Sequence, residues 1–252
     1  MARRATFIQQ ARKQYPHVLL LDAGNALTTD QLLTSSTKGG AMIEGMNRLG
    51  YDAMTLGDQD FRWGPAVLKE RMSEAQFPFL SANVYAGSAQ NLFAQPYVIK
   101  EMAGHRIAVI GVTSKNLVSF LAQGGGEPVL VSDPIETARR TMADLQAAAD
   151  IFIVCSNLGF ALDQQLAAQV AGIALIVGGN PGTLMPEPYR DPAHGTLIVQ
   201  AGYQGEWIGQ LNLQIAADGK VASYQGKTVS LGADFADAPD IRAWLDSLTP
   251  RQ

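Results

Sequence analysis

Seven short apolar runs recur along this chain, and they constrain its fold more than any other feature. They are rich in Val, Ile and Leu and lack the polar alternation of a half-buried strand, so we expect strands that are covered on both faces. The runs span residues 18–21, 53–56, 79–82, 107–112, 151–155, 173–177 and 196–201. Amphipathic stretches separate them, and this alternation predicts a layered α/β fold.

Local signals mark two of the helices. Asp133 is a suitable N-cap, Pro134 suits the first helical position, and Glu136 completes a capping box, so a helix is predicted to begin here. In a second predicted helix, Leu162 and Leu166 belong to the apolar face.

The C-terminal part has a different pattern. Leu211, Leu213 and Ile215 alternate with polar residues, Asp218 and Gly219 form a turn signal, and an apolar run returns after them. This pattern predicts an antiparallel hairpin, so the sheets are expected to be mixed.

Composition excludes several classes of function. The chain has 252 residues, a formal charge of −4 and no Lys/Arg run, which argues against a nucleic-acid partner. No segment reaches the ~18 apolar residues of a membrane span, and the basic, polar residues 1–14 contain no signal-peptide core. The single cysteine, Cys155, lies in an apolar run and is predicted to be a buried strand residue. We therefore expect one domain over residues 1–252 with no membrane or nucleic-acid partner, and the sequence leaves its compartment open.

Polar, glycine-containing loops follow five of the predicted strands. The carboxyl ends of strands are where α/β folds place their sites, and glycine permits tight turns there. The loops are residues 22–25 (DAGN), 57–61 (GDQDF), 156–159 (SNLG), 178–182 (GGNPG) and 201–205 (AGYQG).

In their order along the chain and in their residues, these loops resemble the motifs of the 5'-nucleotidase family, in the calcineurin-like metallophosphoesterase superfamily. Residues 21–25 (LDAGN), 55–62 (TLGDQDFR), 155–159 (CSNLG) and 178–182 (GGNPG) are similar to the family's LDAGD, TLGNHEFD, LSHLG and GGHSH. Residues 77–85 (FPFLSANVY) and 198–202 (IVQAG) are similar to its framework. The resemblance implies a four-layer α/β/β/α sandwich of two mixed sheets. It also implies that the family's first strand, with its Asp-x-His metal motif, is missing from this sequence.

The resemblance further implies two divalent metals, such as Mn, Zn or Mg, but the matching positions hold other residues. Asn25 stands where the family has its bridging Asp, and Asp58 stands at a ligand Asn. Gln59 replaces the catalytic His, and Arg62 replaces the Asp that orients it. Three downstream His positions hold Asn157, Asn180 and Gly182.

These seven positions are predicted to form a remnant pocket without catalytic or metal-binding residues. Two dications ~3.5–4 Å apart need anionic and imidazole ligands, and neutral amides are weaker donors. Gln59 cannot transfer a proton at neutral pH, and the charge of Arg62 opposes a cation. The three histidines, His17, His105 and His194, lie outside the motif loops and are interpreted as surface residues.

Three functions remain compatible with the sequence. The first is an inactive 5'-nucleotidase-like domain that acts as a binding or assembly module, with a protein partner or a small polar ligand. The second is a metal-dependent phosphoesterase or nucleotidase in which Asp58 and amide oxygens hold a hard cation weakly. The third is a subunit or a piece of a longer chain, because the family commonly adds a C-terminal nucleotide-binding domain that residues 1–252 lack. Near the loops, Trp63, Tyr203 and Trp207 fit either packing or a ligand pocket, and packing is the simpler interpretation.

Overall fold

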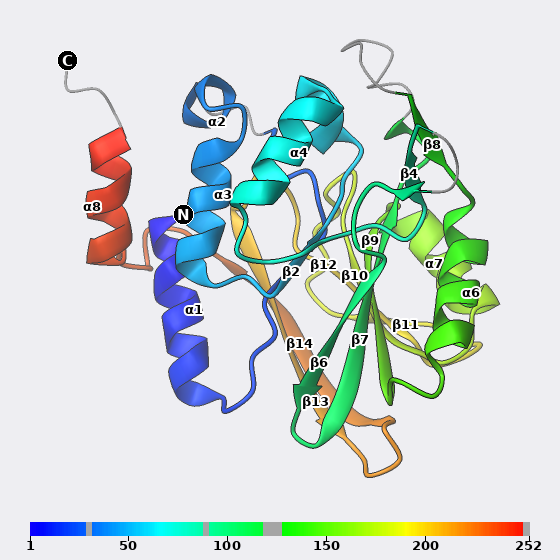
Figure 1. Ribbon diagram of the computed structural model, residues 1–252. Coiled ribbons are helices and arrows are strands. Elements are labelled where there is room, and N and C mark those ends of the chain that lie inside the picture. The colour runs from blue at the N-terminus through cyan, green and yellow to red at the C-terminus, as the bar shows by residue number, and fades with distance from the viewer. Residues whose placement is uncertain (29–31, 88–90, 118–127, 249–252) are drawn as a thin grey trace.

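The computed structural model describes residues 1–28, 32–87, 91–117 and 128–248 as two facing β-sheets between two groups of helices (Figure 1). The helices are α1 (Ala2–Gln14), α2 (Leu32–Ser36), α3 (Gly40–Leu49), the 3-10 helix η1 (Gln59–Trp63), α4 (Pro65–Glu74), α6 (Pro134–Leu145), α7 (Phe160–Gln169) and α8 (Pro239–Leu248). No helix of the described residues is long and apolar enough to cross a bilayer.

The smaller sheet is parallel, with the order β1 (Leu21–Asp22), β2 (Ala53–Thr55) and β3 (Phe79–Leu80). The strand predicted at residues 18–21 begins later in the structure, because the ladder with β2 starts at Leu21. Just before it, Leu20 N donates to the side chain of Asp52 at 2.9 Å.

The larger sheet is mixed, as the sequence predicts. Its order is β11 (Tyr189–Arg190), β12 (Leu197–Gln200), β10 (Ile173–Gly178), β9 (Ile151–Asn157), β7 (His105–Thr113) and β6 (Tyr97–Met102). The four central strands are parallel and the two edge strands are antiparallel to their neighbours.

Shorter β elements complete the fold. The predicted hairpin is confirmed as β13 (Trp207–Ile215) and β14 (Val221–Ser230). Its turn is fixed by Lys220 N, which donates to Asp218 Oδ1 at 3.1 Å. A three-stranded sheet of β5 (Asn91–Leu92), β4 (Val84–Ala86) and β8 (Val129–Val131) lies at one edge.

The helix signals are confirmed in part. Asp133 Oδ1 accepts hydrogen bonds from the backbone N–H groups of Ile135 and Glu136, as an N-cap should. The Glu136 side chain pairs with Arg139 instead of closing a capping box. In α7, Leu162 is 38% exposed, so its assignment to the apolar face is wrong.

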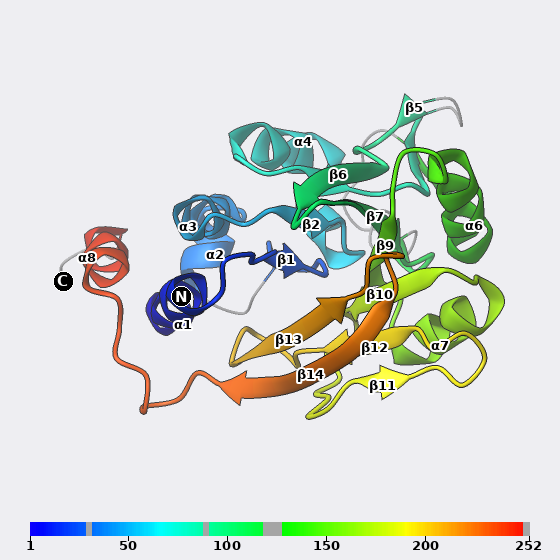
Figure 2. The same cartoon turned by 90° about the horizontal axis from the view of Figure 1, so that it is seen from below.

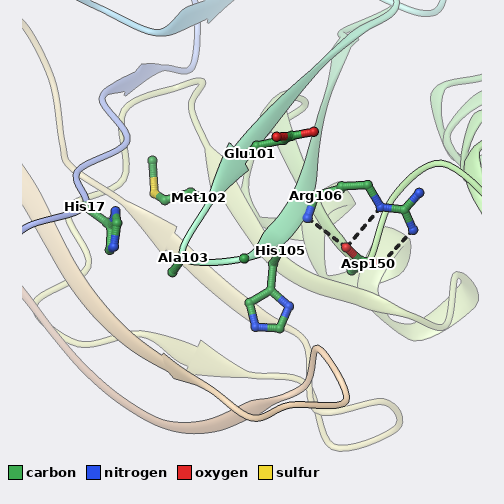
Figure 3. Close-up of a pocket in the computed structure, with 8 residues that line it drawn as sticks. His17, Glu101, Met102, Ala103, His105, Arg106 and Asp150 are labelled. Atoms are coloured by element: carbon green, nitrogen blue, oxygen red, sulfur yellow. Dashed lines mark hydrogen bonds and ion pairs between the residues drawn. The ribbon is translucent and has the colours of Figure 1, made fainter.

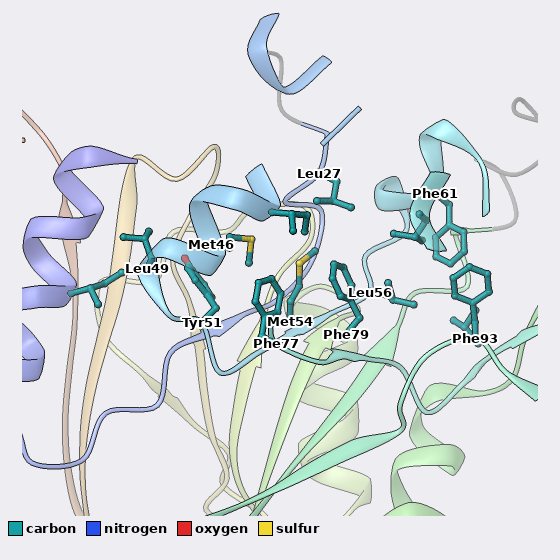
Figure 4. Close-up of a cluster of buried hydrophobic side chains, with 14 of the residues drawn as sticks. Leu27, Met46, Leu49, Tyr51, Met54, Leu56, Phe61, Phe77, Phe79 and Phe93 are labelled. Carbon is teal, nitrogen blue, oxygen red and sulfur yellow. The ribbon is translucent and has the colours of Figure 1, made fainter. Parts of the chain in front are cut away.

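Three apolar clusters separate the layers. One lies between the smaller sheet and α1, α3 and α4, and a second lies under α6 and α7 (Figure 2). Figure 4 shows the aromatic part of the first cluster, in which the ring centroids of Phe61 and Phe93 are 5.0 Å apart and those of Phe77 and Phe79 are 5.7 Å apart. Each fully buried ring of this kind contributes roughly 2 kcal/mol to stability.

The third cluster fills the space between the two sheets. It contains Ala53 and Leu80 from the smaller sheet and Val109, Ile153 and Cys155 from the larger one. This arrangement confirms both the four-layer α/β/β/α fold and the burial of Cys155, which is fully inaccessible.

Hydrogen bonds join the carboxyl ends of the two sheets. Thr55 Oγ1 donates to Cys155 O at 2.8 Å, and Thr113 Oγ1 donates to Leu56 O at 2.7 Å. The polar loops that follow β1, β2, β9 and β10 therefore meet at one place.

Candidate functional site

Two glycines let the first two polar loops touch. A Cβ on Gly57 would lie 2.0 Å from Asn25 Oδ1 and 2.4 Å from Asn25 N. Gly24 has a φ of +90°, and a Cβ there would lie 2.7 Å from Gly57 N. The backbone after β1 thus lies directly against the backbone after β2.

Asp58 is the centre of the group that these loops form, and it is only 3% exposed. Its Oδ1 accepts a hydrogen bond from Asn25 Nδ2 at 3.0 Å, and its Oδ2 accepts one from Asn180 Nδ2 at 3.0 Å. Both carboxylate oxygens therefore already have N–H donors from the protein.

The orientation of two of the amides follows from their other partners. Asn25 Oδ1 accepts from Gln59 N at 2.9 Å, which requires Asn25 Nδ2 to face Asp58. Asn157 Oδ1 accepts from Asp58 N at 3.1 Å, and its Nδ2 donates to Ala23 O at 2.8 Å. Turning either amide over would bring two donors, or two acceptors, together.

Asp60 holds the same two loops together through hydrogen bonds to its carboxylate. It is 1% exposed, and its carboxylate accepts hydrogen bonds from the backbone N–H groups of Asn25, Leu27 and Gly57 at 2.8–3.0 Å. Burial raises the pKa of Asp60 to about 7, and these three hydrogen bonds oppose that rise.

A third buried carboxyl lies under the loop that carries Asn180. Asp163 of α7 is fully buried, and it accepts from Ser156 Oγ at 2.5 Å and from Gln200 Nε2 at 3.1 Å. Burial raises the pKa of Asp163 to about 7, and its hydrogen bonds from Ser156 and Gln200 oppose that rise. This group joins the ends of β9 and β12 to α7.

The structure brings together four of the seven predicted pocket residues through side-chain hydrogen bonds: Asn25, Asp58, Asn157 and Asn180. Gln59 joins them through its backbone N–H.

The other two predicted residues take different positions. Arg62 is exposed, and its guanidinium lies 5.8 Å from the ring centroid of Trp63. Gly182 packs against Tyr203, since a Cβ there would lie 3.1 Å from the Tyr203 Cβ. Tyr203 itself is 57% exposed, so it is not enclosed as a core residue would be.

A two-metal centre does not fit this arrangement. The N–H groups of Asn25 and Asn180 carry positive partial charge and point at the oxygens through which Asp58 would hold a cation. Among the described residues there is also no group of three or more His, Cys, Asp or Glu side chains that could bind a metal.

A surface pocket of about 400 Å³ lies at the other end of the larger sheet (Figure 3). It is lined by His17, by the turn between β6 and β7, and by Asp150 just before β9. Arg106 and Asp150 pair there at 2.7 Å, so each neutralises the other. The pocket is lined by the amino-terminal end of β7, whereas the motif loops follow the carboxyl ends of the strands, and its arginine is already paired.

Sequence reasoning missed Asp60 and Asp163 as residues that organise the site. Positions 163, 166 and 167 form the buried face of α7, but the sequence pattern does not separate this face from the one that carries Leu162. Asp60 lies two residues after Asp58 in a polar loop, and nothing in that pattern shows that its carboxylate is buried.

Comparisons with known proteins show which proteins this chain resembles in sequence and fold. No family model matches the chain. The chain is 30% identical to the trifunctional nucleotide phosphoesterase protein YfkN of Bacillus subtilis over 97% of its own length, and 30% identical to snake venom 5'-nucleotidase of Gloydius brevicauda over 98%. The crystal structure of a 5'-nucleotidase precursor from Thermus thermophilus superposes over 98% of the chain with a TM-score of 0.87 and 27% identity.

The chain spans only part of each of these proteins. It covers 19% of the Bacillus protein, 45% of the venom protein and 52% of the Thermus structure. The similarity is therefore to one part of longer 5'-nucleotidases and nucleotide phosphoesterases.

Proposed function

From the premise that this chain is a homologue of the 5'-nucleotidases over their calcineurin-like metallophosphoesterase domain, we propose that it is a non-catalytic member of that group. Its role is then binding or assembly, with a protein partner or a small polar ligand, and it needs no metal cofactor. Residues 1–252 act as a single domain in this proposal.

One observation carries the proposal: both oxygens of Asp58 accept hydrogen bonds from side-chain amides. In a two-metal phosphatase the corresponding space holds two cations that activate water and bind the displaced oxygens. Here the N–H groups of Asn25 and Asn180 supply the positive partial charge at Asp58 instead. Gln59 also offers no titratable group as a general acid or base.

Metal addition is the direct test of the non-catalytic assignment. We expect less than about 0.1 equivalent of Mn, Zn or Mg in the purified protein. We also expect a change in Tm below about 1 °C on adding millimolar Mn²⁺ or a chelator, because an ion present at 100 times its Kd would stabilise the fold by about 2.7 kcal/mol. Elemental analysis, thermal unfolding and a phosphodiesterase assay supply the three readouts. Stoichiometric metal together with metal-dependent turnover would establish the alternative, an atypical phosphoesterase.

Changing Asn25 to Asp probes the charge balance of the site. The new carboxylate oxygen would lie where Asn25 Nδ2 now lies, 3.0 Å from Asp58 Oδ1, and a hydrogen bond would become a repulsion. We expect Asn25→Asp to lower the free energy of unfolding by about 2 kcal/mol in chelator, with part of the loss recovered in Mn²⁺.

The matched control is Asn25→Ala, which removes the same hydrogen bond without adding charge. It should be less destabilised than Asn25→Asp and should not respond to Mn²⁺. Equal losses in the two variants would mean that the amide does not balance an anionic Asp58. Chemical denaturation with and without metal measures both variants.

A further inference from the structure

We propose that Asp163 and Gln200 form a proton-dependent latch beneath the loop that carries Asn180, closed when Asp163 is a neutral acid and loosened when it is a carboxylate. The latch is independent of the non-catalytic assignment, because none of its groups belongs to the Asp58 network.

The first argument is the balance of charge and donors around Asp163. Its side chain is fully buried, and its two donors are the Ser156 hydroxyl and one Gln200 N–H. An ionised carboxylate can accept about four hydrogen bonds, so its charge in this place is both desolvated and under-satisfied. Around it, β9 presents the Ser156 hydroxyl, β10 presents Gly178 and β12 presents the Gln200 amide. The Cys155 thiol lies on the opposite face of the sheet, where it donates to Asp22 O.

The second argument is an unpaired atom beside the carboxyl. Gln200 is 97% buried, and its Oε1 has no hydrogen-bond partner. When Asp163 takes up one proton from solvent, the new O–H can donate to Gln200 Oε1 if the amide turns over. The turned amide places both N–H groups of Gln200 where the unpaired carbonyl now lies, and the removal of a buried charge outweighs that exchange.

The third argument connects the latch to the loop. A Cβ on Gly178 would lie 2.4 Å from Asp163 Oδ2, so the carboxyl touches the start of the loop directly. The next residue, Gly179, donates its N–H to Ser156 O at 2.7 Å, and Asn180 then reaches Asp58. Water drawn toward an ionised Asp163 must therefore displace the backbone that positions Asn180.

The direction of the pH effect follows from the proton balance. Burial raises the pKa of folded Asp163 to about 7, whereas an unfolded aspartate titrates near ~3.9. Between these values the folded protein keeps a proton that the open chain has released. The stabilisation is therefore present at low pH and is lost as the pH rises through about 7.

Residue-specific NMR tests the latch in the intact chain. The carboxyl ¹³C signal of Asp163 should titrate with a midpoint near about 7. The opening constant of the Gly179 amide, from hydrogen exchange, should rise about tenfold between about pH 6 and about pH 8, as a pKa near 7 requires.

Two variants complete the experiment. Asp163→Asn should lose the tenfold rise of the Gly179 opening constant that the wild type shows, while Asp144→Asn, a change at an exposed position of α6, should behave as the wild type. Asp60 also titrates near about 7, but its contribution is common to all three proteins and cancels in the comparison. An Asp163 midpoint near ~4 in the wild type, or an opening constant that does not change with pH, would overturn the proposal, even if Asp163→Asn did not fold.

Discussion

Replacing Asp60 with alanine should destabilise the protein by about 4 kcal/mol, the largest effect that we expect from any residue of the site. The carboxylate of Asp60 is the acceptor for three backbone N–H groups, those of Asn25, Leu27 and Gly57. Without it these donors are left buried and unpaired, at a cost of roughly 1–3 kcal/mol for each donor that water cannot reach. Urea denaturation at about pH 8 measures the change, because Asp60 is mostly ionised above its pKa of about 7.

Asp60→Asn is the matched control. An amide in the same position keeps one acceptor oxygen, and its NH₂ group would face an N–H donor. It also removes the buried charge, which offsets part of the loss. We expect a loss of about 1 kcal/mol, clearly smaller than that of Asp60→Ala. If Asp60→Ala stayed within about 0.5 kcal/mol of the wild type, the three hydrogen bonds would not hold the loops together.

Replacing Gly57 with alanine should cost about 3 kcal/mol, the second largest effect. The new methyl group would lie 2.0 Å from Asn25 Oδ1 and 2.4 Å from Asn25 N. The second contact is with backbone, so no side-chain rotation relieves it, and the two loops must separate. Separation would also break the hydrogen bond from Asn25 to Asp58.

Gly232→Ala is the comparison for this experiment. At that position the nearest heavy atom to a new Cβ would be Ser230 Oγ at 3.7 Å, and φ does not lie in the left-handed region. Its free energy of unfolding should therefore stay within about 0.5 kcal/mol of the wild type or rise slightly. Equal stability of Gly57→Ala and Gly232→Ala would contradict the close packing of the two loops.

The metal and latch experiments address different parts of the same site. Metal titration reports on Asp58 and its amide partners, and the pH dependence of Gly179 reports on Asp163 below them. A protein that binds no metal but shows the pH response would support both proposals. A protein that binds metal and still shows the pH response would overturn only the first.

The sequence was informative wherever a local rule was sufficient. Apolar runs without polar alternation located the parallel strands, since burial on both faces leaves that pattern whatever the exact neighbours are. Asp133 and Pro134 located the start of α6, because capping depends only on adjacent backbone groups. The 3.6-residue period of apolar residues predicted the wrong buried face for α7. Leu162 and Asp163 are adjacent there, and only packing decides which of them is buried.

For the site, the sequence by itself determined the chemical character of the seven matched positions: mostly amides and one carboxylate, Asp58, where a metallophosphoesterase needs imidazoles and more negative charge. Only the tertiary structure decided what these groups do. It turned the N–H groups of Asn25 and Asn180 toward Asp58, and it buried Asp60 and Asp163 beneath the loops. The reason is physical: residue type fixes which groups can donate or accept. Burial and the direction of each hydrogen bond depend on strands that are distant in sequence and meet only in the fold.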